Sequence, residues 1–550
     1  MIENSTRGAT LALGVNPFTR PRELRRAIVS HVRLTPEIRF DGKGFICALI
    51  NSRCPVGCAH CMFGSNMQEP RNAFNTMTPE RVSKLMELVA DSHTGYLLVS
   101  GGGEGFLEPG LMCQIAEESS ADLTWMVTSA FWAKSESRAS EVLGELHDAH
   151  LRGKMRRPDK RVCVRISVDE QHVTRLAADA RDPLAYIVNA IRVFESTYSK
   201  EPDFFVQIHS IEGDAALMER LRRRMSATAV SGASPIHEGA KITESAVKFR
   251  LPSGYEFDVT YAKLLLSDTA ADLRDRALLR KRIEIWEKDA LVNQHGKPGC
   301  QLNPDGTVGT NMLVIYDGRV ACGWQSEMPD VPINVDVDSY EQIIEKSLSD
   351  PGVLATVERG VAYRFKIIDE VCPKASLRAK AVNIRDYTSP VLFEEDAVKL
   401  YYSIRATQDF IGAGRISDDE IDNWPVQLGE LARRSPDDLK TLYHTSGYDI
   451  VRQFEETEPG FAGFRAALRA FAATQAGTQF VDATREACRD DLRRADKWRL
   501  LLRRIAHDWY DIKSLTTREM AAVAVAERLI DEQLLGGRRI YEGLSRLQRE

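Results

Sequence analysis

Residues 44–66 read GFICALINSRCPVGCAHCMFGSN, an apolar run that breaks into three cysteines, Cys54, Cys58 and Cys61. The run at residues 45–50 has the length and composition of a buried strand. Thiols spaced four and three residues apart on one short loop can all bind one small metal centre. Three thiols leave a four-coordinate centre one ligand short, so the loop predicts a centre with one open position.

The segment from residue 44 to about residue 261 alternates short apolar runs with helix-like stretches. Strands separated by helical segments predict parallel βα units, and five or six units predict an α/β fold with an open or partial barrel. In such folds the chemistry lies at the carboxyl ends of the strands. The predicted strands are residues 45–50, 96–100, 123–128, 162–168 and 204–209, with a sixth at either 246–251 or 255–260.

The clearest helix start lies between the first two strands. Thr78 offers an N-cap hydroxyl, Pro79 takes the first helical position and Glu80 places an acid in the first turn. We expect an amphipathic helix to follow. Its apolar face consists of Val82, Leu85, Met86 and Val89.

The later parts of the chain have a different pattern. Asp305-Gly306 and Asp317-Gly318 are hairpin-turn dipeptides on either side of an apolar run, which predicts a small β insertion. From residue 386 onwards almost the whole sequence has a helical pattern. We therefore expect four parts: an N-terminal extension over residues 1–40, the α/β unit over 41–265, a β-hairpin module over 266–385 and an all-helical domain over 386–550.

The composition is that of an ordinary globular protein. Of 550 residues, 43% are hydrophobic, and 73 basic residues stand against 79 acidic ones, for a net charge of −6. The charges form no acidic or basic tail, so nothing global indicates nucleic acid or an anionic membrane as a partner. The sequence has neither a signal-peptide pattern nor an apolar run of about eighteen residues, which predicts a cytoplasmic location. In that location, ten cysteines are better explained as thiols or metal ligands than as disulfides.

A structural zinc site is one explanation of the cysteine loop, with His60 or a distant residue as the fourth ligand. Zinc sites usually pair two C-x2-C units. Here a single C-x3-C-x2-C run is present without a second pair. His60 is the immediate neighbour of Cys61 and is therefore poorly placed to bind the same ion. An iron–sulfur cluster with three thiolate ligands fits the spacing better, because its open iron can accept a chelating ligand.

This C-x3-C-x2-C loop after a first strand resembles that of the radical S-adenosylmethionine (radical SAM) superfamily. The resemblance implies a partial (β/α)6, TIM-like barrel and a [4Fe-4S] cluster on Cys54, Cys58 and Cys61, whose unique iron binds S-adenosyl-L-methionine. It also implies an enzyme that cleaves this cofactor reductively to a 5′-deoxyadenosyl radical, which takes a hydrogen atom from the substrate. An electron donor such as flavodoxin or ferredoxin is then expected as a partner.

The second predicted strand ends in the sequence GGGE, residues 101–104. Glycines at the carboxyl end of a strand let the backbone approach a ligand closely, although a plain glycine-rich turn is the alternative. The segment resembles the Gly-Gly-Glu motif of the same superfamily. That resemblance implies that Gly102, Gly103 and Glu104 bind the cofactor.

Weaker similarities follow along the chain. Ser167 and Asp169 end the fourth predicted strand, where the superfamily often has a Ser-x-Asp segment near the cofactor. A buried strand hydroxyl and a helix N-cap are the alternatives for these two residues. His60 stands at the position that lies against the adenine ring in the superfamily. Residues 127–130 depart from the superfamily pattern, and we assign them no contact.

Cys300, Cys322 and Cys372 form a third set. The segment YDGRVACGW around Cys322 resembles the hairpin of the twitch/SPASM modules that carry an auxiliary cluster after the barrel. The resemblance implies at most one second iron–sulfur cluster on these three cysteines. Ordinary packing in a core is the alternative, because free cysteine is among the most buried residues. We interpret the other four cysteines as packing residues: Cys47, Cys113, Cys163 and Cys488.

The sequence identifies neither the substrate nor the residues that react with it. Only about forty residues precede the first strand, which favours a small-molecule substrate of a biosynthetic pathway over a peptide. A radical SAM peptide maturase and an RNA modification enzyme are the alternatives, and a zinc-stabilised scaffold is the alternative from another class. The basic residues at 493–504 are interleaved with acids, as on a solvated helix face, so nucleic acid is disfavoured.

Overall fold

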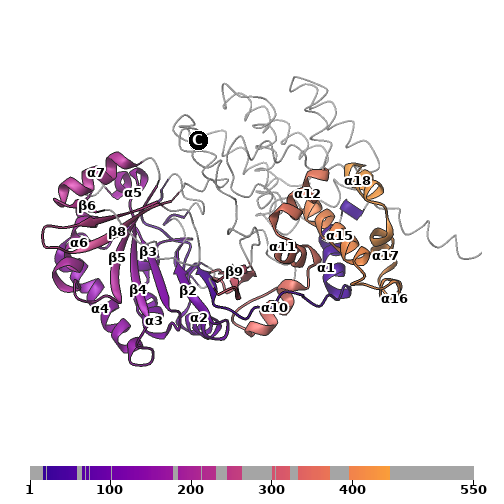
Figure 1. Ribbon diagram of the computed structural model, residues 1–550, viewed down its shortest axis with the longest axis horizontal. Helices are drawn as coiled ribbons and strands as arrows, with labels where there is room; N and C mark the ends of the chain where they lie inside the picture. The colour runs from indigo at the N-terminus through magenta and orange to yellow at the C-terminus, as the bar shows by residue number, and fades with distance from the viewer. Residues whose placement is uncertain are drawn as a thin grey trace, which may run out of the picture.

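A computed structural model of the chain describes residues 17–19, 21–58, 65–67, 70–72, 75–100, 102–176, 182, 184–211, 214–230, 245–262, 300–303, 305–322, 332–371 and 396–445. These residues form an α/β body and a helical body, which lie side by side along the long axis of the molecule (Figure 1). Among the helices of the described ranges, none is both long and apolar enough to cross a membrane.

One sheet organises the α/β body. Its strand order is β11-β10-β1-β2-β3-β4-β5-β8-β7-β6, and β9 pairs with β10 away from this path. The central strands are all parallel and follow one another in chain order, which confirms the predicted βα units. They are β1 (Gly44–Ala48), β2 (Thr94–Val99), β3 (Leu123–Thr128), β4 (Arg161–Ser167), β5 (Phe204–Ile211) and β8 (Glu256–Ala262). Among the described strands, the order ends at β11 and β6, and these two end strands do not pair with each other.

The structure decides between the two candidates for the sixth strand. The run near residues 255–260 is β8, which pairs with β5 in parallel from Gln207↔Asp258 to Ile211↔Ala262. The run near residues 246–251 is β7 (Ser245–Arg250), which is antiparallel to β8 and to β6 (Thr228–Val230). The chain therefore reverses direction between β7 and β8, and β8 becomes the next parallel strand beside β5.

The helices of the α/β body lie against one side of the sheet (Figure 1). The predicted helix start is confirmed: Pro79 begins α2, the Thr78 hydroxyl accepts a hydrogen bond from the Arg81 N–H, and all four predicted apolar residues are buried. The other helices are α3 (Pro109–Glu118), α4 (Glu136–Lys154), α5 (Glu170–Leu176), α6 (Ala185–Thr197) and α7 (Ala215–Arg224), with α2 at Pro79–Asp91 and a 3-10 turn, η2, at Gly105–Leu107.

Alternate strand residues point to the other side of the sheet, as the two-residue period of a strand requires. On β4, Val162, Val164 and Ile166 belong to the large core beneath the helices. Cys163 instead packs with Leu123 and Trp125 in a separate apolar cluster. The burial of Cys163 agrees with the packing role expected for this cysteine. Other strand residues on the same side of the sheet, away from the helices, are candidates to contact a ligand.

The predicted β insertion is present, and it extends the main sheet. It comprises β9 (Cys300–Leu302), β10 (Val308–Val314) and β11 (Val320–Cys322). Gly306 and Gly318 have φ values of 86° and 88°, the left-handed region that such turns demand. β10 pairs with β1 in parallel, from Phe45↔Asn311 to Ala48↔Val314. This segment therefore shares one sheet with the expected α/β unit.

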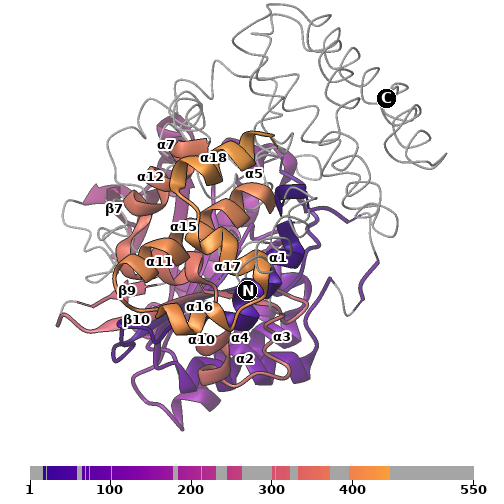
Figure 2. The same ribbon diagram turned by 90° about the vertical axis from the view of Figure 1, so that its right-hand side faces the viewer.

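The helical body surrounds a second core, which includes Phe18, Leu354, Tyr401, Phe410 and Tyr443. α15 packs against α1 and α11, so helices from the predicted N-terminal extension, the predicted module and the predicted helical domain meet in this core (Figure 2). The helices are α1 (Pro21–His31), α10 (Tyr340–Leu348), α11 (Pro351–Arg359), α12 (Val361–Val371), α15 (Asp396–Gly412), α16 (Asp418–Asp422), α17 (Val426–Arg433) and α18 (Pro436–Thr445), with a 3-10 turn, η1, at Pro17–Thr19.

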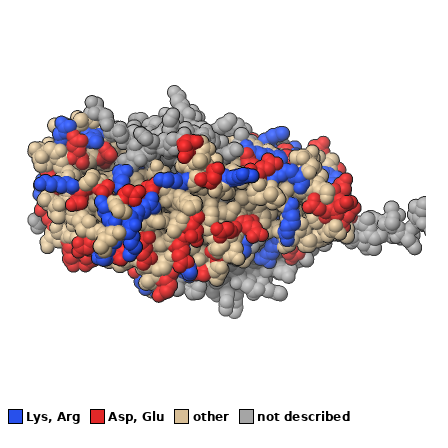
Figure 3. All heavy atoms as spheres, turned by 60° about the horizontal axis from the view of Figure 1, so that its bottom comes forward, with Lys and Arg blue, Asp and Glu red and all other residues tan. Residues whose placement is uncertain are grey.

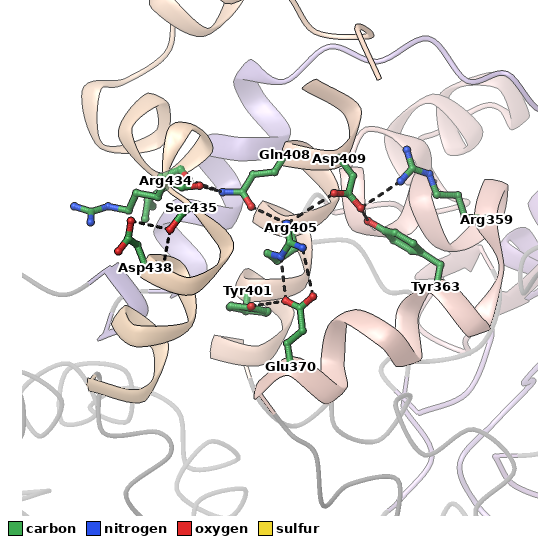
Figure 4. A network of polar contacts seen from close by, with 11 residues as sticks. Arg359, Tyr363, Glu370, Tyr401, Arg405, Gln408, Asp409, Arg434, Ser435 and Asp438 are labelled. Atoms are coloured by element: carbon green, nitrogen blue, oxygen red, sulfur yellow. Dashed lines mark hydrogen bonds and ion pairs between the residues drawn. The ribbon is translucent and has the colours of Figure 1, made fainter. Parts of the chain in front are cut away.

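A polar network holds α12 to α15 (Figure 4). The Glu370 carboxylate accepts hydrogen bonds from the Tyr401 hydroxyl at 2.6 Å and from Arg405 Nε at 3.1 Å. The Tyr363 hydroxyl donates to Asp409 at 2.9 Å. Charge-assisted hydrogen bonds of this kind are stronger than neutral ones, so the network fixes the angle between the two helices.

Candidate metal centre

The cysteine loop follows β1 at its carboxyl end, as predicted. Cys54 and Cys58 are free thiols that remain partly exposed, whereas His60 and Cys61 lie outside the described residues. The two thiols pack against a small cluster of Val56, Leu176 and Tyr186. The loop therefore lies against α5, which follows β4, and against α6.

Backbone hydrogen bonds fix the start of this loop. Asn51 and Arg53 accept hydrogen bonds through their carbonyl groups from Gly103 N–H at 2.5 Å and Glu104 N–H at 2.8 Å. On the other side, the N–H of Cys54 donates to the carbonyl of Asn66 at 3.2 Å. The position of Cys54 is consequently set by the segment that follows β2 and by the later part of its own loop.

Gly102 and Gly103 have a clear structural reason to be glycine. Gly102 has a φ of 68°, and a Cβ added there would lie 2.5 Å from the carbonyl oxygen of Asn51. A Cβ on Gly103 would collide with the backbone of Arg53 and the side chain of Asn51. The space that the missing side chains leave is thus filled by residues 51–53 of the cysteine loop. Contact of either glycine with a cofactor stays a prediction.

Glu104 is buried, with 4% of its surface exposed. Its Oε2 accepts hydrogen bonds from the N–H of Ser129 at 2.8 Å and from the Ser129 hydroxyl at 2.7 Å, and its Oε1 accepts from the N–H of Phe106 at 3.2 Å. Burial raises the pKa of this carboxyl group, and the hydrogen bonds from Ser129 oppose the rise. Glu104 joins the ends of β2 and β3 through Ser129, which lies in the stretch 127–130 to which the sequence analysis assigns no contact.

Asp169 forms the N-cap of α5. Its Oδ1 accepts hydrogen bonds from the N–H groups of Gln171 at 2.9 Å and His172 at 3.0 Å. This is the alternative role that the sequence left open, and contact with a cofactor stays a prediction. Ser167 is partly exposed at the end of β4, in register with His209 on β5.

His172 is a residue of the site that the sequence did not reveal. Its Nδ1 lies 2.6 Å from Oδ2 of Asp169, and the thiol of Cys58 is a second polar neighbour of the imidazole. Burial alone would lower the pKa of His172, but Asp169 and Cys58 raise it well above the ordinary value for histidine. The sequence VDEQH offers one local signal, an N-cap aspartate followed three residues later by a histidine.

A second polar group lies on the sheet side that faces away from the helices. Thr260 on β8 accepts a hydrogen bond from Arg165 Nη2 at 3.2 Å, and its hydroxyl lies 3.1 Å from Nδ1 of His209. Burial and then the charge of Arg165 lower the pKa of His209 well below its ordinary value, so this imidazole is neutral near pH 7. Three strands that are separate in sequence thus bring a guanidinium, a neutral imidazole and a hydroxyl together.

The hairpin cysteines are only partly described. Cys300 is buried in the core of the helical body, Cys322 ends β11, and Cys372 lies outside the described residues. The N–H of Asn303, after β9, donates to the carbonyl of Thr307, and the N–H of Ile315, after β10, donates to the carbonyl of Arg319. Backbone groups an even number of residues apart on a strand point to the same edge, as those of Thr307 and Ile315 do. Strands β9 and β11 therefore lie along the same edge of β10. Cys300 pairs with Thr310 and Cys322 with Met312, two residues further along β10. The two cysteines therefore occupy adjacent places on that edge.

In the part of the chain that the structure describes, no group of three His, Cys, Asp or Glu side chains is arranged to hold a metal ion. The third cysteine of each predicted set, Cys61 or Cys372, lies outside that part. Both sets of ligands consequently stay predictions as complete sites.

Residues 40–171 match the model of a family described as a 4Fe-4S single cluster domain. This match supports an iron–sulfur protein. The matched segment contains β1 to β4, the cysteine loop, residues 102–104 and Asp169. A comparison with curated proteins found no match to the chain.

The described residues fit such a cluster. Burial raises the pKa of the Cys54 thiol to about 11, while hydrogen bonds from the backbone N–H groups of Gly57 and Val56 favour its thiolate. The imidazole of His172 is a polar neighbour of Cys58. Thiolate ligands of iron–sulfur clusters are commonly stabilised by N–H groups that point at the sulfur. In the loaded protein, thiolate ligands would take the place of both thiols.

Proposed function

We propose that this protein is a radical SAM enzyme with a [4Fe-4S] cluster on Cys54, Cys58 and Cys61. The observation that carries the proposal is the place of the cysteine loop, at the carboxyl end of β1 and hydrogen-bonded to residues 103 and 104 at the carboxyl end of β2. The match of residues 40–171 to a 4Fe-4S family supports the cluster. Six parallel strands in chain order are compatible with a partial (β/α)6 barrel.

The three cysteines would hold the cluster and would leave one iron open to S-adenosyl-L-methionine, whose reductive cleavage would supply a 5′-deoxyadenosyl radical. The chain's own residues position the reactants and exclude water. His60, Gly102, Gly103, Glu104, Ser167 and Asp169 are proposed to surround the cofactor. The hydrogen-bonded side chains of Arg165, His209 and Thr260 are proposed to face the substrate, because they lie on the sheet side opposite the described helices of the α/β body.

A small molecule remains the favoured substrate class, with flavodoxin or ferredoxin as the electron donor. Acidic and basic side chains are interspersed on the face shown in Figure 3. Among the described residues, ion pairs join Arg157 and Lys43 to Asp122, and Arg152 to Glu117. Paired charges neutralise one another, so neither the mixed face nor these pairs favour the alternative of an RNA substrate.

The decisive experiment uses the full chain, purified and reconstituted without oxygen. Wild-type protein should be brown and should convert S-adenosyl-L-methionine to 5′-deoxyadenosine in the presence of a strong reductant, as measured by chromatography and mass spectrometry. Cys54→Ala, Cys58→Ala and Cys61→Ala should each abolish this product. Cys113→Ala is the matched control, because that partly exposed thiol lies on α3 outside the loop.

Two outcomes contradict the proposal. Retained cleavage in any one of the three loop variants would remove the assigned ligand set. A colourless protein that contains zinc would favour the scaffold alternative, in which the loop has a structural role only.

A further inference from the structure

Helix α5 turns one face towards the cysteine loop. Leu176 packs in the cluster that contacts Cys54 and Cys58, and His172 lies one helical turn earlier on the same face. The contact between this face and the loop therefore involves both an apolar and a polar side chain. Since α5 directly follows β4, its position relative to the loop is set by the parallel sheet.

The ring of His172 is held from two sides. Asp169 uses Oδ1 to cap the backbone of α5 and Oδ2 to bind Nδ1 of His172 at 2.6 Å. Only 5% of the Asp169 side chain and 20% of the His172 side chain are exposed. One carboxylate thus fixes the start of the helix and the orientation of the imidazole together, and Cys58 is the polar neighbour of this imidazole on the cysteine loop.

We propose that His172, oriented by Asp169, is a positioning residue that donates a hydrogen bond to the Cys58 thiolate and raises the reduction potential of the cluster. This inference rests on the proposed cluster ligation by Cys54, Cys58 and Cys61. It goes beyond it by assigning a role to a side chain that neither touches the reacting atoms nor belongs to the cysteine loop.

The physical reason is electrostatic. Reduction adds an electron to a cluster whose sulfur ligands already carry negative charge. An N–H donor at a ligand sulfur stabilises the added charge, and hydrogen bonds to sulfur are one of the means by which proteins set cluster potentials. Loss of the donor should therefore make the cluster harder to reduce.

The test compares variants of the full, anaerobically reconstituted chain. His172→Phe keeps a planar ring of similar size without a donor, and His172→Gln keeps an amide donor. Asp169→Asn keeps an oxygen for the N-cap but loses the carboxylate that orients the imidazole. His31→Gln is the matched control, because this exposed histidine lies on α1 in the helical body.

The readouts are iron content, the midpoint potential from a redox titration followed by electron paramagnetic resonance, and the Fe–S stretching frequencies. We expect His172→Phe to retain the cluster and to shift its potential to a more negative value. His172→Gln should restore part of that shift, Asp169→Asn should give a smaller shift of the same sign, and His31→Gln should give none. The stretching frequencies should change in His172→Phe alone or most strongly there.

Three results would overturn the inference. The first is an unshifted potential in a His172→Phe protein with full iron content. If that variant does not hold iron, an unshifted potential in Asp169→Asn decides against the inference. Loss of the cluster in all three variants would give the pair a role in folding instead. A wild-type protein without a cluster is a different result, because it contradicts the proposed function itself.

Discussion

The carboxylate of Glu104 accepts two hydrogen bonds from one residue, Ser129, through its backbone N–H at 2.8 Å and its hydroxyl at 2.7 Å. The contact connects the segments that follow two neighbouring parallel strands, β2 and β3. Because Glu104 N–H also binds the carbonyl of Arg53, the chain after β1 is connected to the same point. The ends of three strands are thus joined around one buried acid.

Ser129→Ala should destabilise the fold by about 1–3 kcal/mol, because it removes one hydrogen bond to a buried carboxyl group. Urea unfolding followed by circular dichroism measures the loss. Ser140→Ala, on the exposed side of α4, is the control and should change the free energy of unfolding by no more than about 0.5 kcal/mol. Equal stability of the two variants would mean that the Glu104–Ser129 contact contributes nothing to the fold.

Gly103→Ala should weaken the cysteine loop itself. The added Cβ would collide with Arg53 and Asn51, so we expect a loss of about 1–3 kcal/mol in stability and a lower iron content after reconstitution. Gly110→Ala is the control, since a Cβ there meets nothing within 4 Å. Normal iron content together with weaker binding of S-adenosyl-L-methionine would instead support direct contact between Gly103 and the cofactor.

Lys160 should make stability depend on pH. It is fully buried, donates to the carbonyl groups of Ala116 at 2.7 Å and Glu117 at 3.1 Å, and has a pKa lowered from 10.5 to about 8, first by burial and then by the charges of Arg156 and Arg157. Between these two pH values the unfolded chain keeps a proton that the folded protein has released. The free energy of unfolding of the wild type should therefore rise with pH in this window.

The rise should amount to at most about 3 kcal/mol relative to Lys160→Met, measured by urea unfolding between pH 7 and 10.5. Below about pH 8 both states are protonated, so the difference between wild type and variant should be constant there. Lys84→Met, at an exposed position of α2, should show no such trend. A flat difference for Lys160→Met would show that this lysine titrates alike in the folded and unfolded states.

A second cluster on Cys300, Cys322 and Cys372 would raise the iron content to about eight per chain, against about four for the loop alone. The adjacent places of Cys300 and Cys322 along β10 support two of these ligands. The burial of Cys300 among apolar residues of the helical body supports simple packing instead. The triple Cys→Ala variant should lose half the iron and keep S-adenosyl-L-methionine binding, whereas unchanged iron would reduce the set to packed thiols.

The sequence by itself determined the features that depend on neighbouring residues. Thr78 and Pro79 specify the start of α2, and Asp317-Gly318 specifies a hairpin turn, because caps and turns are governed by local hydrogen bonds and backbone angles. Alternation of apolar runs with helical segments likewise predicted the parallel βα units. The spacing of the cysteines predicted a shared centre without any knowledge of the fold.

Only the tertiary structure decided which distant residues meet. The choice of β8 over β7 as the sixth parallel strand, the pairing of β10 with β1, and the contacts of Glu104 with Ser129 and of His172 with Cys58 all join segments far apart in the chain. Such contacts depend on strand order and register, which fix the positions of side chains after every element has packed. A single sequence records the local preferences of each segment, whereas the energy that selects among pairings arises only when the segments are buried together.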